Sequence, residues 1–346
     1  MSNLLNAKRI FSAFVSLFVI QLFILSQASA GLIGTQQEIE MGKEVARQIE
    51  EKYPLLDDAE VQARIDRIGK NIVAVCDRPD LPYTFKVLDV DEVNAMAAPG
   101  GFIYVYSGLI KLMPTDDELA GIIGHEIGHV VKRHSMGQLE KNLGISLIFG
   151  GIFGDKGKPL QSIALSAISA GYSRSDERQA DLLGYQQSVK AGYNQYGMLM
   201  GLTKLYELNP KQRNDLFSDH PEASARIELM KQYLAEAHVT PTVKQIDANA
   251  AQVVDGDWSL PVIHTGVGAT GPLYRAYLVA GRLYDIKNLE NYSKDKYEIR
   301  EMGRDLAIYY DDRNVVTVTS EDAAFYEVSV RTLADRYMES LRNWSI

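Results

Sequence analysis

The chain has 346 residues, of which 46% are hydrophobic and 23% are charged, so it can bury a sizeable core in one large domain or two smaller ones. Its formal net charge of −9 argues against a broad nucleic-acid-binding surface. Cys76 is the only cysteine, which excludes an intrachain disulfide and leaves the core or a metal to hold the fold together.

The N-terminus is typical of an export signal. Lys8 and Arg9 precede an apolar run from Ile10 to Leu25, and the small residues Ala28-Ser29-Ala30 follow it. We therefore expect a signal peptide over residues 1–30 and a periplasmic protein, with a peripheral membrane contact as a minor alternative. An uncleaved anchor is the other interpretation, but the apolar run is shorter than the roughly twenty residues that span a bilayer.

Two helices and a small sheet are predicted next. Apolar positions recur at helical spacing from Thr35 to Cys76, and Pro54 divides this run into two helices. The stretch "YTFKVLDVDEVNAMAAPGGFIYVYSG" (83–108) alternates and is rich in β-branched and aromatic residues, with Pro99-Gly100-Gly101 as a turn. We expect two or three strands here, arranged as a β-meander.

The next helix carries two histidines and a glutamate. Thr115-Asp116-Asp117-Glu118 fits a capping box that starts a helix before an apolar run. His125 and His129 are four residues apart, about 40° in rotation, so both rings project from one face. Glu126 lies beside that face. This His-Glu-x-x-His spacing is typical of zinc sites in which the ion acidifies a water and the glutamate takes its proton.

A catalytic zinc needs a third protein ligand and one open position. His134 is five residues past His129, about 140° round the helix, so we expect it to point away and to be structural. Glu177 and Asp181 are four apart on a predicted helix, where one could ligate zinc and the other support a ligating histidine. The alternative is a solvated acidic face paired with neighbouring arginines. The upstream motif favours the metal site.

The rest of the chain divides into more helices and a different C-terminal part. Helical patterning continues to about Ala237, with interruptions near 150–159 and 209–221. Residues 239–258 lose periodicity and are predicted to be a linker. The stretch "LAIYYDDRNVVTVTS" (306–320) predicts a hairpin, and "AAFYEVSVRTLADRYMESL" (323–341) predicts a terminal helix.

Four segments carry a family resemblance. They are "NAMAAPGGFIYVYSGLI" (94–110), "HEIGH" (125–129), "YSRSDERQAD" (172–181) and "HPEASARI" (220–227). Together they resemble the HtpX and CaaX-prenyl-protease family of gluzincin metallopeptidases, most closely its soluble periplasmic, BepA-like branch. The membrane-embedded relatives carry spanning helices, whereas the apolar stretches at 145–154 and 162–171 are too short to cross a bilayer.

The resemblance implies an α+β fold in which a mostly helical, zincin-type domain carries a small β-sheet beside the active-site helix. The expected order is a signal peptide (1–30), a zinc metallopeptidase domain (31–240), a linker (241–258) and a small α+β domain of unknown role (259–346). One Zn2+ per chain is implied, bound by His125, His129 and Glu177. Glu126 is the implied general base, and Asp181 is the implied support of a ligating histidine.

Two further sites are implied by the same resemblance. Asn94-Ala95-Met96-Ala97 corresponds to an edge strand that binds extended peptide backbone, although Asn94 also suits an ordinary turn. His220 and Arg226 match a family motif near the zinc, where they could act in catalysis by stabilising the oxyanion. Alternatively, His220 could occupy the open zinc position and hold the enzyme latent.

The leading interpretation is a zinc endopeptidase that hydrolyses unfolded or misassembled exported polypeptides in periplasmic protein quality control. The alternative is a zinc-containing chaperone or binding module with little proteolysis, whose C-terminal domain engages an envelope protein partner. A candidate base beside the ligands favours the enzyme, because a structural zinc site is closed and has no use for one. No nucleic acid is expected as a partner, and no membrane-spanning segment is expected after signal cleavage.

Overall fold

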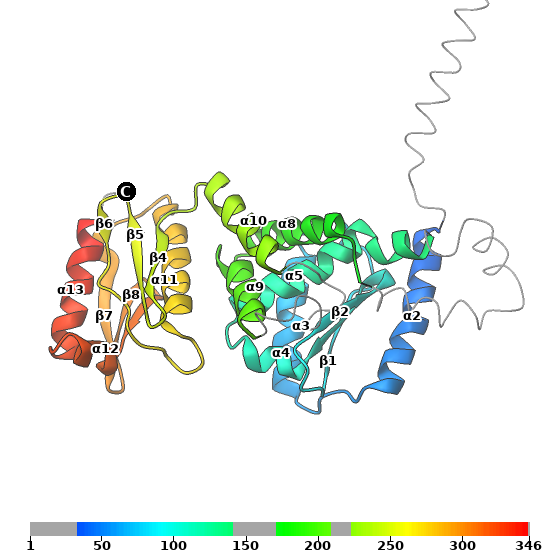
Figure 1. Ribbon diagram of the computed structural model, residues 1–346, viewed down its shortest axis with the longest axis horizontal. Helices are drawn as coiled ribbons and strands as arrows, with labels where there is room; N and C mark the ends of the chain where they lie inside the picture. Colours follow the sequence, from blue (N-terminus) through cyan, green and yellow to red (C-terminus); the bar gives the residue numbers. More distant parts are fainter. Residues whose placement is uncertain (1–32, 141–170, 209–222, 345–346) are drawn as a thin grey trace, which may run out of the picture.

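The computed structural model describes residues 33–140, 171–208 and 223–344 (Figure 1). The predicted signal peptide over 1–30, nearly all of the two short apolar stretches and His220 lie outside these residues. Within the described ranges, no helix is both long enough and apolar enough to cross a membrane. The elements up to α10 form one lobe and those from β4 to α13 form another, as Figure 1 shows.

The two predicted N-terminal helices are confirmed as α2 (Thr35–Lys52) and α3 (Ala59–Val73). Asp58 caps α3, because its carboxylate accepts hydrogen bonds from the backbone N–H groups of the second and third helical residues. The apolar positions that predicted α3 supply its core face, which buries Ile65, Ile68 and Ile72.

A three-stranded sheet follows, made of β1 (Thr84–Leu88), β2 (Ala95–Ala98) and β3 (Phe102–Tyr106). The predicted strands are confirmed, but the predicted meander is wrong: the order is β1-β3-β2, with β1 parallel to β3. The turn Pro99–Gly101, with positive φ at both glycines, folds β2 onto β3. The longer connection after β1 then lets that strand pair with the far side of β3, which local pattern does not predict.

Helix α5 (Asp116–Lys132) follows α4 (Ser107–Leu112) and is the central helix of the first lobe. Its predicted capping box is confirmed, since Thr115 and Glu118 exchange hydrogen bonds between side chain and backbone. Every residue from Glu118 to Val130 is buried. α5 packs against α3, the sheet, α8 (Arg174–Lys190) and α9 (Gly197–Leu208), and α10 (Ala223–Glu236) covers α8 and α9.

The predicted linker is wrong. Residues 242–259 form an antiparallel sheet of β4 (Thr242–Asp247), β5 (Ala250–Asp255) and β6 (Trp258–Ser259). The strands are short, so they show little periodicity, yet Ala251 and Val253 are completely buried beneath α11 (Pro272–Lys287). The C-terminal lobe therefore begins with β4, directly after α10.

The C-terminal lobe continues with the antiparallel strands β7 (Tyr297–Met302), β8 (Asp305–Tyr310) and β9 (Arg313–Val318). The β8–β9 pair confirms the predicted hairpin. The predicted terminal helix is divided into α12 (Ser320–Phe325) and α13 (Val330–Asn343). The division has a local cause, because Glu327 has a positive φ of 53° and Ser329 caps the second helix.

The two lobes share one hydrophobic cluster, which runs from Ile65 in α3 to Trp344 after α13. Polar contacts join them as well: Asn194 donates to the carbonyl of Leu278 at 3.0 Å, and the Tyr196 hydroxyl donates to the carbonyl of Pro241 at 2.9 Å. The fold is α+β, as expected, with a mostly helical lobe and a lobe of two small sheets, three α-helices and a short 3-10 helix (Lys294–Lys296) among the described residues.

Candidate metal centre

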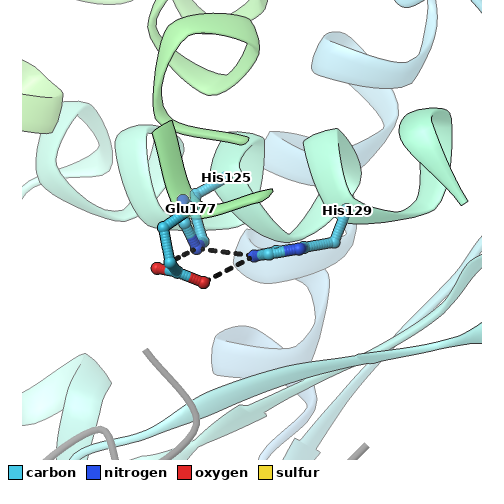
Figure 2. A group of neighbouring side chains, drawn as sticks. All are labelled: His125, His129 and Glu177. Carbon is cyan, nitrogen blue, oxygen red and sulfur yellow. Dashed lines mark hydrogen bonds and ion pairs between the residues drawn. The ribbon is translucent and has the colours of Figure 1, made fainter. Parts of the chain in front are cut away.

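Three buried side chains from two helices converge at one point (Figure 2). His125 and His129 extend from one face of α5, and Glu177 extends towards them from the first turn of α8. The two Nε2 atoms lie 2.9 Å apart. The Glu177 carboxylate oxygens lie 3.4 Å from Nε2 of His129 and 3.6 Å from Nε2 of His125. All three residues are at most 3% exposed.

This donor set fits a zinc ion. Tetrahedral zinc with bonds of about 2.0–2.1 Å to nitrogen and oxygen keeps its ligand atoms about 3.3 Å apart. The observed separations of 2.9, 3.4 and 3.6 Å lie around that value. Two imidazoles and one carboxylate are also the ligands of catalytic zinc in one large group of hydrolases, where the fourth position holds water.

Helices α5 and α8 approach so closely because glycines lie between them. A Cβ on Gly184 would lie 2.5 Å from the backbone nitrogen of His125, and one on Gly124 would lie 2.8 Å from the carbonyl oxygen of Gly184. Gly128 packs in the same way on Ala180. This backbone contact brings the carboxylates of α8 within reach of the histidines of α5.

His125 is supported by Asp181, one turn after Glu177. The Nε2 atom of His125 faces the other two candidate ligands, so the proton of this ring lies on Nδ1. The Nδ1–H of His125 donates to Asp181, at 2.9 Å. Arg226 on α10 donates to both oxygens of Asp181, at 2.8 and 2.7 Å. Burial alone would raise the pKa of Asp181, but the charges and hydrogen bonds of Arg226 and His125 outweigh it and lower the pKa to about 2.

Arg226 also contacts Glu177, with 2.9 Å between Nη1 and Oε2. Burial lowers the pKa of this guanidinium, but the two carboxylates and, more weakly, Glu126 raise it above its ordinary value. These contacts favour a role in holding Asp181 and Glu177 in place, whereas the expected role at the oxyanion stays a prediction. The other residue predicted to act there, His220, lies outside the described residues.

Glu126, the expected general base, is 1% exposed and follows His125 directly on α5. It lies close enough to Arg226 to contribute to the raised pKa of that guanidinium. The expected base, the candidate ligands and the supporting residues therefore occupy one buried cluster.

His134 does not point away, so that expectation is wrong. α5 ends at Lys132, and Arg133 adopts a left-handed conformation with φ of 58°, so the chain turns back towards the metal centre. The Nδ1 of His134 lies 2.9 Å from the Nδ1 of His129. The expectation failed because it continued an ideal helix past its real end. The basic pair before His134 is only a weak sign of a helix C-terminus.

The expected peptide-binding segment lies at an edge of the first sheet. β2 pairs only with β3 in the described sheet, and it contacts α5. The carbonyl of Asn94 accepts a hydrogen bond from Tyr106 N–H, so by alternation Met96 also pairs inward, while Ala95 and Ala97 face the outer edge. The Asn94 side chain accepts from the N–H of Ala95, at 2.8 Å, as a turn residue would.

Comparison with known proteins gives matches for both lobes. Residues 59–234 match Peptidase family M48, and residues 251–344 match a domain of unknown function (DUF8459). Metalloprotease YcaL of Escherichia coli (strain K12) is 30% identical over 221 residues, which cover 61% of this chain and 82% of the relative.

Two further relatives are longer. The putative beta-barrel assembly-enhancing protease of Vibrio cholerae is 28% identical over 264 residues, 67% of this chain and 54% of the relative. The beta-barrel assembly-enhancing protease of Yersinia pestis is 25% identical over 238 residues, 64% of this chain and 49% of the relative. The chain thus spans about half the length of these two proteins.

Proposed function

Since the chain belongs to peptidase family M48 and is a metalloendopeptidase, we propose that His125, His129 and Glu177 hold one zinc ion per chain for peptide hydrolysis. The observation that carries this proposal is the convergence of three buried ligand atoms from two helices, at separations suited to a tetrahedral ion. Zinc in such a site acidifies a water molecule and polarises the substrate carbonyl.

Three side chains beside the ligands have separate roles in this proposal. Glu126 accepts the proton of the attacking water and later delivers it to the leaving amine. Asp181 keeps the proton of His125 on Nδ1, so that the Nε2 lone pair faces the ion. Arg226 keeps Asp181 ionised through Nε and Nη2, and it holds Glu177 through Nη1, its remaining guanidinium nitrogen.

Substrate binds as an added strand on β2 in this proposal. The backbone groups of Ala97 and the carbonyl of Ala95, which do not pair with β3, would hydrogen-bond to an extended peptide, while Met96 and Asn94 bond to β3. Strand addition recognises backbone and leaves side-chain identity weakly specified. It therefore suits unfolded polypeptides better than folded ones, because only unfolded chains offer extended segments.

The proposed substrates are unfolded or misassembled exported proteins in the periplasm, with an envelope protein as a partner of the C-terminal lobe. The leader pattern at residues 1–30 supports export. Two relatives are named beta-barrel assembly-enhancing proteases, which supports a role beside envelope proteins. Membership of a peptidase family favours this function over that of a binding module with little proteolysis.

The variant Glu126→Gln tests the mechanism. The amide keeps the size of the side chain and does not ligate the ion, so we expect zinc content to stay unchanged and kcat on casein to fall about 10²–10⁴-fold. Wild-type protein that is stripped by a chelator should lose activity and regain it with zinc. A Glu126→Gln protein that cleaves casein at the wild-type rate would refute the mechanism.

A further inference from the structure

We propose that His134 is a positioning residue for the candidate ligand His129, the counterpart of what Asp181 does for His125. The inference rests on the proposed function, because it takes His129 as a ligand of zinc. It goes beyond that function by assigning a task to a histidine outside the His-Glu-x-x-His motif.

The orientation of the rings fixes which nitrogen donates. Nε2 of His129 faces His125 and Glu177, so a metal-binding His129 carries its proton on Nδ1. Nδ1 of His134 lies 2.9 Å from Nδ1 of His129, so it must accept the hydrogen bond that the Nδ1–H of His129 donates. An imidazole that accepts a hydrogen bond on Nδ1 is in its neutral form, so this geometry assigns a neutral ring to His134.

The carboxylate of Asp176 lies near the second ring nitrogen of His134. With Nδ1 as acceptor, the ring of His134 carries its proton on Nε2, which lies 3.7 Å from Oδ1 of Asp176. The other oxygen of Asp176 accepts from the N–H and hydroxyl of Ser173, at 3.2 and 2.7 Å, and so closes the capping box of α8. Glu177 is the next residue, so one turn of α8 holds a candidate ligand and the support of another.

The faces of the His129 ring are constrained too. Tyr172 stacks on it, with 3.8 Å between ring centroids and 20° between planes. The Tyr172 hydroxyl lies 2.8 Å from the hydroxyl of Ser135, the residue after His134. The stack limits tilting of the ring, and the hydrogen bond from His134 limits its rotation and tautomer.

The two histidines are thus held by different chemistry. His125 donates to the ionised carboxylate of Asp181, whose charge is balanced by Arg226. His129 instead donates to the neutral imidazole of His134. Removing the acceptor at position 134 would free the ring of His129 to turn or to change tautomer. Loss of such an outer partner typically costs 10–100-fold in metal affinity.

Two substitutions separate positioning from packing. In His134→Asn, the amide oxygen takes the place of Nδ1 and can accept the same hydrogen bond. In His134→Leu, the volume is kept but the acceptor is lost. We expect zinc dissociation constants, measured by chelator competition on the full chain, to rise about 10–100-fold for His134→Leu and by less than about threefold for His134→Asn.

Control and spectroscopic arms complete the test. His264→Leu makes the same exchange in the C-terminal lobe, where His264 stacks on Phe325, and should leave zinc affinity unchanged. Cobalt-loaded wild type and His134→Asn should share one visible spectrum, which shifts in His134→Leu. If His134→Leu does not fold, His134→Gln replaces it, because its amide oxygen lies one bond too far out to accept and zinc should again bind more weakly.

The outcomes are distinguishable. His134→Leu that binds zinc as tightly as wild type would overturn the inference, as would a folded His134→Asn that is as weak as His134→Leu. Wild-type protein that takes up no zinc would instead refute the proposed function, and with it the premise of the inference.

Discussion

At the scale of single residues, Arg226 shows what a motif can and cannot predict. The family resemblance predicted that Arg226 lies near the zinc, but no sequence pattern predicts which atoms it contacts. Its guanidinium binds both oxygens of Asp181 and one oxygen of Glu177 within a buried cluster. A lysine could not make these paired contacts, because it offers a point charge in place of a planar fork.

Asp285 on α11 offers a residue-scale prediction outside the metal centre. It lines a cavity of about 610 Å3 between the lobes, together with Asp117, Arg282 and Arg313. Burial raises the pKa of Asp285 to about 6, against weaker lowering by Gln195 and Arg313. The folded protein therefore binds this proton more tightly than the unfolded chain, whose aspartate has a pKa of 3.8.

The resulting stabilisation is fully present below about pH 4 and is lost as pH rises through about 6. We expect Asp285→Asn, which cannot ionise, to be more stable than wild type at pH 7, on the order of 2 kcal/mol. At pH 4 the two proteins should differ little. Urea unfolding at both pH values measures the difference in unfolding free energy between the two proteins. A difference of equal size at pH 4 and pH 7 would contradict the expectation.

At the scale of elements, the packing of α5 on α8 decides whether the candidate ligands meet. Both helices are predictable, since capping boxes and apolar spacing mark them locally. Their backbone-to-backbone approach depends on Gly124 and Gly128 of α5, which face Gly184 and Ala180 of α8 in a distant part of the sequence. In the sequence these glycines only weaken the helical prediction, because glycine is a poor helix former.

Gly184→Ala tests this packing. The added methyl would lie 2.5 Å from the backbone nitrogen of His125, so the helices must separate. We expect the free energy of unfolding to fall by about 1–3 kcal/mol. Zinc affinity should fall as well, because Glu177 moves away from the histidines. Gly137→Ala is the matched control, since a Cβ there meets nothing within 4 Å. A Gly184→Ala protein that binds zinc as tightly as wild type would contradict the claim that this helix contact positions Glu177.

Sequence reasoning succeeded where the signal was local and failed where it was not. The histidine pair, the capping box and the Glu177–Asp181 spacing each lie within one helix, so their placement could be predicted from local sequence, whereas the roles of these side chains at a metal stay proposals. The position of His134 beside the metal centre depends on one left-handed residue, Arg133, which is neither glycine nor asparagine and is only a weak sequence sign of a helix end. The β1-β3-β2 order and the strands from 242 to 259 depend on partners distant in sequence.

At the scale of the whole molecule, the metal centre lies in the first lobe, while the second lobe packs against α9 and the loop after α8. One hydrophobic cluster joins the lobes, and Asn194 sits so close to Gly281 that a Cβ there would collide with its side chain. The domain of unknown function therefore packs on the peptidase lobe directly, without an intervening linker.

The central claim is that three side chains, from two helices, bind one zinc ion. Anomalous diffraction at the zinc absorption edge, from crystals of the wild-type chain grown with zinc, tests it most directly. We expect one strong peak about 2.0–2.2 Å from Nε2 of His125, Nε2 of His129 and an oxygen of Glu177. Ordered side chains with no peak between them, or a peak that Glu177 does not approach, would contradict the account.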